Sequence, residues 1–196
     1  MMDSSKELIK YVEGTYKSTA KQLAHNIIRG HLRSISSDIE DGVAIFISKA
    51  LPQDYKLFLD PSINIDHNIN RPDLLVVDSH DNVAAMIEIK ANMGWCRDAK
   101  PIIDNIIKKD TLFRSTEKLI CEFSNQKIVE VSYEEGVKLY LISLTDKNCP
   151  VQHHEQNKQY ASNNNISYYN LFTGWYDSLQ VKDAAVFISN LVASIP

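Results

Sequence analysis

Two short apolar runs joined by a polar turn constrain the fold of this chain more than any other feature. The runs extend from Leu74 to Val77 and from Val83 to Ile87, and five polar residues, 78–82, lie between them. Short runs rich in valine and isoleucine are typical of strands, and the Asp and Asn residues of the polar segment tolerate the left-handed backbone angles of a tight turn. We therefore predict a β-hairpin.

The turn sets which residues of the hairpin face each other. If it is centred on His80 and Asp81, the predicted pairs are Val83 with Asp78, Ala84 with Val77 and, further out, Glu88 with Asp73. Directly opposed residues share a face of the sheet, with Cβ atoms about 5 Å apart, and side chains alternate along a strand, so Lys90 joins Glu88 and Asp73. Two carboxylates this close repel each other, and a divalent cation would relieve that repulsion.

Both faces of the predicted hairpin are otherwise apolar. The face of the carboxylates also carries Leu75, Val77, Ala84 and Met86, and the other face carries Leu74, Val76, Ala85, Ile87 and Ile89. A strand that is apolar on both faces is covered on both faces. We therefore expect helices on each side of the sheet, with the carboxylates at the strand ends, where a cleft can reach solvent.

Hydrophobic periodicity predicts the other elements. The expected helices are one or two over Ser5–Leu32, interrupted near Gly14; one from Ser37 or Asp38 to about Ala50; one over about Asp98–Phe123, or two that meet near Asp110; a short, polar and exposed one within Gln152–Asn165; and one over Val181–Ile195. The expected strands are Tyr55–Ile65, Asp73–Asp78, Val83–Ala91, Val137–Leu144 and Ile166–Phe172. This order favours an α/β fold, a three-layer sandwich in which helices flank a mixed central β-sheet.

Composition places the chain among globular proteins. Its 196 residues are 44% hydrophobic and 23% charged, which is typical of one domain with a sizeable core. We treat residues 1–196 as a single domain with a helical N-terminal segment over about residues 1–36. The sequence has no apolar stretch near 18 residues and no apolar core of a signal peptide, so we expect a cytoplasmic protein with no membrane partner. The three cysteines, Cys96, Cys121 and Cys149, fit neither a zinc site nor a disulfide framework and are expected to be reduced thiols.

Charge does not by itself favour a nucleic-acid partner. The formal net charge is -4, whereas contact with phosphate needs positive potential. Basic residues nevertheless exceed acidic ones from Met1 to Ser36. That segment could face a phosphate backbone, or it could form an ordinary solvated helix surface.

The charged end of the hairpin resembles a known signature. Pro72-Asp73 together with Glu88-Ile89-Lys90 is similar to the motif of the PD-(D/E)XK nucleases, the superfamily of type II restriction endonucleases, Holliday-junction resolvases and several repair nucleases. The order of the elements expected from about Ser37 to Leu144 also resembles the restriction endonuclease-like αβββαβ core of that family. Outside this stretch we find no specific match.

The resemblance implies a Mg²⁺ site, with Mn²⁺ as a substitute. Its ligands would be Asp73, Glu88 and the backbone carbonyl of Ile89, because hard oxygen ligands suit this ion. Lys90 would orient or help to deprotonate the attacking water and would stabilise charge on the phosphate.

Many members of the family add an acidic residue from the helix before the strands. Glu40 is the best candidate here, because it shares a helical face with Val43 and Ile47 and could point at the sheet. The implied catalytic set is Asp73, Glu88, Lys90 and Glu40, and Glu40 could also bind the metal. A solvated helix charge is the alternative interpretation of Glu40.

Other polar and aromatic residues have weaker claims. Asn92, Trp95, Arg97 and Lys100 could line the cleft and touch phosphate or bases, or they could form a loop with Trp95 buried. We interpret the remaining groups as structural: His153-His154, because adjacent residues do not converge on one ion; Lys108-Lys109, as a solvated helix face; and Tyr168, Tyr169, Phe172, Trp175 and Tyr176, as packing.

The leading hypothesis is a Mg²⁺-dependent DNA endonuclease of the type II restriction enzyme kind that hydrolyses phosphodiester bonds. We expect it to act on double-stranded DNA as a homodimer, because two symmetry-related sites can cut both strands. One alternative is a structure-specific repair, recombination or phage nuclease of the same fold. Another is a non-catalytic DNA-binding or interaction module on a nuclease scaffold, in which Asp73, Glu88 and Lys90 form only a cross-strand ion pair.

Overall fold

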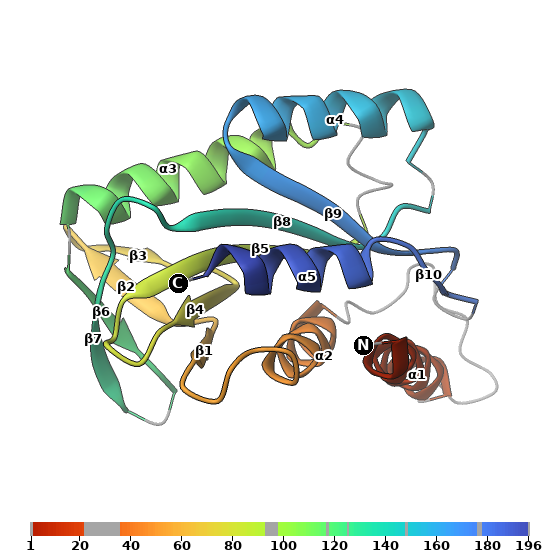
Figure 1. Ribbon diagram of the computed structural model, residues 1–196, viewed down its shortest axis with the longest axis horizontal. Coiled ribbons are helices and arrows are strands. Elements are labelled where there is room, and N and C mark those ends of the chain that lie inside the picture. The colour runs from red at the N-terminus through yellow and green to blue at the C-terminus, as the bar shows by residue number, and fades with distance from the viewer. Residues whose placement is uncertain are drawn as a thin grey trace.

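A mixed six-stranded sheet forms the centre of the protein in the computed structural model, which describes residues 2–21, 36–92, 98–116, 118–124, 126–147, 149–175 and 178–195 (Figure 1). The strand order is β1-β4-β5-β8-β9-β10. The strands are β1 (Lys56–Leu59), β4 (Leu74–Val77), β5 (Val83–Asn92), β8 (Lys138–Thr145), β9 (Ile166–Thr173) and β10 (Gln180–Val181). Strands β5, β8 and β9 run parallel, whereas β1 and β4 add an antiparallel edge.

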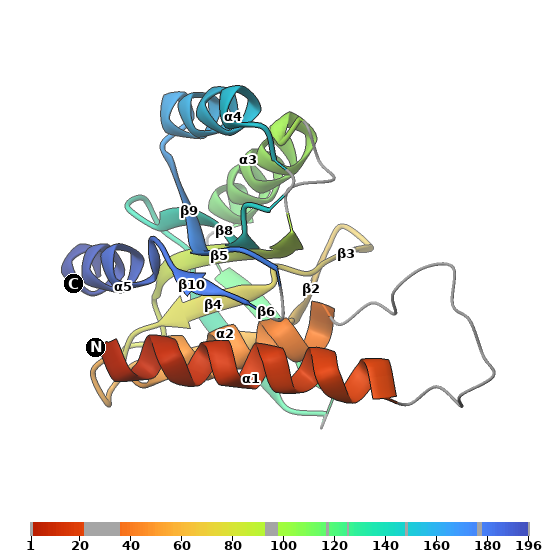
Figure 2. The ribbon, with the colours of Figure 1, turned by 90° about the vertical axis from the view of Figure 1, so that its right-hand side faces the viewer.

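Helices cover both faces of this sheet. They are α1 (Met2–Lys21), α2 (Ser36–Ser48), α3 (Lys100–Thr116), α4 (Val151–Asn163) and α5 (Ala184–Ser194). Helices α1, α2 and α5 share one apolar core with the sheet, and α3 and α4 share another core on the opposite face (Figure 2). The predicted three-layer α/β architecture with a mixed sheet is therefore confirmed. None of the helices in the described residues combines the length and apolar character that crossing a membrane requires.

A second, four-stranded sheet was not predicted. It has the order β3-β2-β6-β7, and its strands are β2 (Ser62–Ile65), β3 (Asn68–Asn70), β6 (Lys118–Glu122) and β7 (Ile128–Ser132). The single strand expected over Tyr55–Ile65 is wrong, because the chain turns at Asp60, with φ 45°, and enters the second sheet.

The helix expected to reach Phe123 ends at Thr116 instead. Beyond this point the apolar period changes from helical spacing to alternation, since Leu119 and Cys121 are buried while their neighbours are exposed. Ile120 is apolar but exposed, so the apolar residues of this segment do not alternate cleanly in the sequence. The helix has no break at Asp110.

Two further predictions about helices need correction. Helix α1 passes through Gly14 without interruption, and the expected continuation to Leu32 lies outside the described residues. The polar helix α4 was expected to be exposed, but His154, Asn157 and Ala161 are buried against the sheet. Tertiary packing covers one side of a helix whose composition alone gave no apolar stripe.

The hairpin β4–β5 has the predicted register over most of its length. Leu74 faces Ile87, and the same pairing continues to Val76 opposite Ala85. At the turn a β-bulge intervenes, so that Val77 faces Val83 rather than Ala84. Ala84 therefore packs in the core on the α2 side instead of on the side of the carboxylates, because the extra residue of a bulge shifts the alternation.

Asp78 organises the turn of this hairpin. Its Oδ1 accepts hydrogen bonds from the backbone N–H groups of His80 and Asn82, both at 2.8 Å, and its Oδ2 accepts one from Asn82 Nδ2 at 3.1 Å. Asp81 adopts the left-handed conformation expected for the turn, with φ 61°. Burial acts to raise the pKa of Asp78, but these hydrogen bonds outweigh burial and lower it.

Asp78→Ala is expected to lower the free energy of unfolding by about 1–2 kcal/mol, because the turn loses its side-chain acceptor. A carboxylate with a lowered pKa stabilises the folded state above its ordinary pKa, and this contribution is lost as the pH falls through the folded-state value. The difference between wild type and the variant should therefore shrink below about pH 4. Urea unfolding at pH 7 and pH 3 measures both effects, and equal stability of the two proteins at pH 7 would contradict the role of Asp78.

The cysteines that the structure describes are free thiols. Cys121 is buried in the second sheet, and burial raises its pKa to about 11. Cys149 is half-buried, and burial also raises its pKa. Cys96 lies outside the described residues.

Candidate active site

Asp73 lies at the entrance to strand β4 and is held against strand β5. Pro72 precedes it and is buried. Because proline has no N–H to donate to a β-ladder, it fits a position at the start of a strand. Asp73 Oδ2 accepts a hydrogen bond from the backbone N–H of Ile89 at 2.6 Å. Asp73 and Glu88 are the next residues outward from the pair Leu74–Ile87, so the hairpin register brings them close together as predicted.

Three oxygen atoms converge on the ammonium group of Lys90. Its Nζ lies 2.9 Å from Glu88 Oε1, 3.1 Å from the carbonyl oxygen of Ile89 and 3.3 Å from Asp73 Oδ2. These are the three groups that the sequence resemblance implied as metal ligands. They therefore form a cluster of hard oxygen atoms next to one positive charge.

This donor set fits a small divalent cation. Carboxylate and carbonyl oxygens are the preferred ligands of Mg²⁺ and Mn²⁺, and such ions keep several waters beside a few protein ligands. A cation bound by these oxygens would take the place of the Lys90 ammonium group. Lys90 would then be released toward the open side of the site, where 31% of its side chain is already exposed.

The second oxygen of Glu88 has a partner that the sequence analysis missed. Lys109 Nζ, from helix α3, lies 3.0 Å from Glu88 Oε2 and 2.8 Å from the carbonyl oxygen of Arg71. The interpretation of Lys109 as part of a solvated helix face is therefore wrong. Only the packing of α3 on the sheet brings residues 88 and 109 together, so no local pattern in the sequence marks this lysine.

The pKa values of Asp73 and Lys90 are shifted because two carboxylates lie close together and are largely shielded from solvent. Burial and the charge of Glu88 raise the pKa of Asp73, against the opposing influence of Lys90 and the Ile89 N–H group. Burial disfavours the Lys90 ammonium group, but Glu88 and Asp73 outweigh burial and raise its pKa. Lys90 is therefore fully charged at neutral pH, and it compensates a carboxylate pair that would otherwise repel.

Glu40 lies beside this site on helix α2 and is half-buried. Burial raises its pKa most, followed by the charge of Asp73, while Lys90 acts in the opposite direction. Glu40 therefore interacts electrostatically with both Asp73 and Lys90. Within the described ranges no three Asp, Glu, His or Cys side chains form a group that could hold a metal ion, so direct ligation by Glu40 stays a prediction.

The weaker candidates have various positions. The side chains of Asn92, Trp95 and Arg97 lie outside the described residues. Lys100 begins helix α3 and lies over the ring of Tyr160, 5.6 Å from its centroid. His154 is buried, and Asn170 Nδ2 lies 3.0 Å from its Nε2, so its role is in the packing and hydrogen bonding of the protein interior.

The described members of the aromatic group divide between core and surface, and Tyr176 lies outside the described residues. Tyr168 and Phe172 are buried, and Tyr169 packs on Tyr140 and Phe187. Trp175 is 47% exposed, with Lys147 Nζ 5.4 Å from its ring centroid.

The mixed sheet, its flanking helices and the carboxylate hairpin define an α/β protein of restriction endonuclease-like architecture. Among solved structures its fold is similar to that of NucC from P. aeruginosa ATCC27853 in its cAAA-bound form, with 10% identity and a TM-score of 0.54 over 98% of this chain and 91% of that chain. It is also similar to the apo form of NucC from E. coli MS115-1, with 10% identity and a TM-score of 0.50 over 98% of this chain and 90% of that chain. No family model and no curated protein sequence matches the chain. The similarity therefore concerns the fold.

Proposed function

We propose that this protein is a metal-dependent DNA endonuclease whose site is built from Asp73, Glu88 and Lys90. The observation that carries the proposal is the convergence of Asp73 Oδ2, Glu88 Oε1 and the Ile89 carbonyl on the ammonium group of Lys90. The likeness in fold to the NucC nucleases supports a nuclease, and Mg²⁺ or Mn²⁺ suits the donor set.

The residues of the site would divide the work of phosphodiester hydrolysis. Asp73, Glu88 and the Ile89 carbonyl would hold the ion, which when bound lowers the pKa of a water molecule and neutralises charge on the phosphate. Lys90, displaced from the carboxylates, would donate hydrogen bonds to the attacking water or to a phosphate oxygen. Glu40 would add negative charge on the α2 side, where it could bind the ion directly or through water.

The kind of nuclease is the finer part of the proposal. We favour an enzyme of the type II restriction enzyme kind that acts on double-stranded DNA in the cytoplasm as a homodimer, because two symmetry-related sites can cut both strands at one position. A structure-specific nuclease of the same fold and a non-catalytic DNA-binding or interaction module are the competing outcomes. The net charge of -4 opposes contact with phosphate, so within the last alternative it favours an interaction module over a DNA-binding one.

Incubation of supercoiled plasmid with the protein in Mg²⁺, in Mn²⁺ and in EDTA tests the proposal. We expect nicked and linear products with either metal and none in EDTA, with cut ends that share a sequence. Ends without a common sequence, together with preferred cleavage of branched or single-stranded DNA, would support the structure-specific alternative. Binding of DNA without cleavage under all conditions would support the non-catalytic module.

A further inference from the structure

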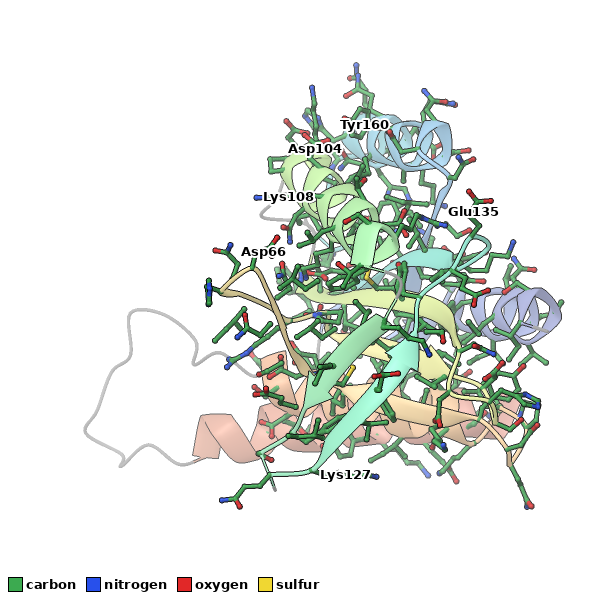
Figure 3. All side chains as sticks on the ribbon, turned by 90° about the vertical axis from the view of Figure 1, so that its left-hand side faces the viewer. Asp66, Asp104, Lys108, Lys127, Glu135 and Tyr160 are labelled. Atoms are coloured by element: carbon green, nitrogen blue, oxygen red, sulfur yellow. The ribbon has the colours of Figure 1, made fainter. Side chains whose placement is uncertain are left out.

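Lys109 is unusual among the lysine side chains that the structure describes because it is almost fully buried. Only 11% of it is exposed, whereas its neighbour Lys108 points away from helix α3 into solvent (Figure 3). Burying a long cationic side chain costs desolvation and rotamer entropy, so it needs compensating partners. Lys109 has two such partners, Glu88 Oε2 and the Arg71 carbonyl.

The two oxygens of Glu88 are divided between two lysines. Oε1 faces Lys90, at the point where the other metal-ligand oxygens converge, and Oε2 faces Lys109 on the side of α3. An ion that replaces the Lys90 ammonium group gains Oε1, but Oε2 is already engaged. The glutamate side chain is only 8% exposed, so it has little room to rotate away from Lys109.

We infer that Lys109 is a specificity-determining positioning residue, which keeps Glu88 monodentate and thereby selects a small octahedral ion over Ca²⁺. This inference rests on the proposed function of the site as a metal centre. Mg²⁺ and Mn²⁺ accept one oxygen per carboxylate in near-octahedral geometry, whereas Ca²⁺ gains from bidentate carboxylates and higher coordination numbers. Because Lys109 holds Oε2, this second oxygen is not available as a ligand for Ca²⁺.

A purely electrostatic effect of Lys109 can be separated from this geometric one. Removing a positive charge near the site strengthens the binding of every divalent ion by a similar factor, because the ions carry equal charge. The ratio of the dissociation constants for Ca²⁺ and Mn²⁺ cancels that factor. The ratio therefore reports whether Oε2 has become available as a ligand.

Calorimetric titration of the metal-free protein with Mn²⁺ and with Ca²⁺ tests the inference. Lys109→Met keeps the length and the apolar stem of the side chain but removes the ammonium group, and Lys108→Met is the matched control on the same helix. In Lys109→Met we expect the ratio Kd(Ca²⁺)/Kd(Mn²⁺) to fall by about tenfold, within the range that loss of a group orienting a metal ligand produces. In Lys108→Met the ratio should equal that of wild type.

Several outcomes would overturn the inference. An unchanged ratio in Lys109→Met, whatever its stability, would leave Lys109 as a residue that only ties α3 to the sheet. If that variant does not fold, the comparison of the two ions in the wild-type protein decides instead. Wild-type protein that binds Ca²⁺ as tightly as Mn²⁺ would contradict the inference without any variant, whereas wild type that binds neither ion would overturn the proposed metal site itself.

Discussion

Asp73→Asn is expected to reduce DNA cleavage by at least about 10³-fold at saturating metal. A metal ion contributes several kcal/mol of transition-state stabilisation, and each 1.36 kcal/mol corresponds to about a factor of ten in rate. The substitution removes one of the two carboxylate charges that hold the ion. The binding of Mn²⁺ should weaken together with the rate.

Asparagine separates the charge of Asp73 from its structural role. The amide oxygen can still accept the hydrogen bond that the Ile89 N–H now donates to Oδ2, so the hairpin is preserved. Because burial and Glu88 raise the pKa of Asp73, losing its charge should also relieve repulsion in the metal-free protein. We therefore expect the melting temperature of the metal-free variant to equal or exceed that of wild type.

Plasmid cleavage, Mn²⁺ calorimetry and a thermal melt of the same preparation measure these effects. The matched control is Asp104→Asn on helix α3, where Asp104 accepts a hydrogen bond from Tyr160 at the surface (Figure 3). Wild-type cleavage by Asp73→Asn would remove Asp73 from the site. A loss of cleavage that appears equally in Asp104→Asn would point to a general effect on the fold.

Lys90→Met should separate catalysis from metal binding. We expect cleavage to fall by about 10²–10³-fold, because the proposed hydrogen-bond donor to the attacking water or a phosphate oxygen is lost. Binding of Mn²⁺ should become tighter, because no ammonium group competes for Asp73 Oδ2, Glu88 Oε1 and the Ile89 carbonyl. A variant that binds its ion better and cleaves far less is the signature of this arrangement.

The metal-free Lys90→Met protein should also be less stable. Two carboxylates remain without the charge that compensated them, but the site is partly open to water, so the cost is about 1–2 kcal/mol rather than that of a fully buried pair. This corresponds to a melting temperature lower by roughly 2–8 °C, and Mn²⁺ should restore it. Lys108→Met serves as the control, and weaker Mn²⁺ binding by Lys90→Met would contradict the competition between ammonium and ion.

The hairpin register was predictable because its determinants are local. The turn residues 78–82 and the alternation of side chains placed Glu88 opposite Asp73, and the pairs from Leu74–Ile87 to Val76–Ala85 agree with this prediction. The bulge that moved Ala84 to the other core was not predictable, because the same residue is compatible with either face. Its small side chain carries too little hydrophobic free energy to decide.

The second sheet escaped prediction for a related reason. Strand β6 follows a helix after one intervening residue, and an exposed isoleucine interrupts its polar face, so the sequence reads as a continued helix. The strand is stabilised by pairing with β2, which lies far before it in the sequence, and with β7, which follows it. Non-local pairing of this kind overrides a weak local preference.

By itself the sequence determined the layered α/β architecture, the hairpin and the carboxylate pair with Lys90, because apolar periodicity and turn chemistry act between near neighbours. Only the tertiary structure decided that Lys109 shares Glu88 with Lys90 and that Glu40 lies within electrostatic range of Asp73. Those relations depend on how α2 and α3 pack on opposite faces of the sheet. Close packing of side chains sets that geometry. The helical face of Glu40 indicated that it could point at the sheet but not how near Asp73 it would lie, and no pattern within α3 marks Lys109.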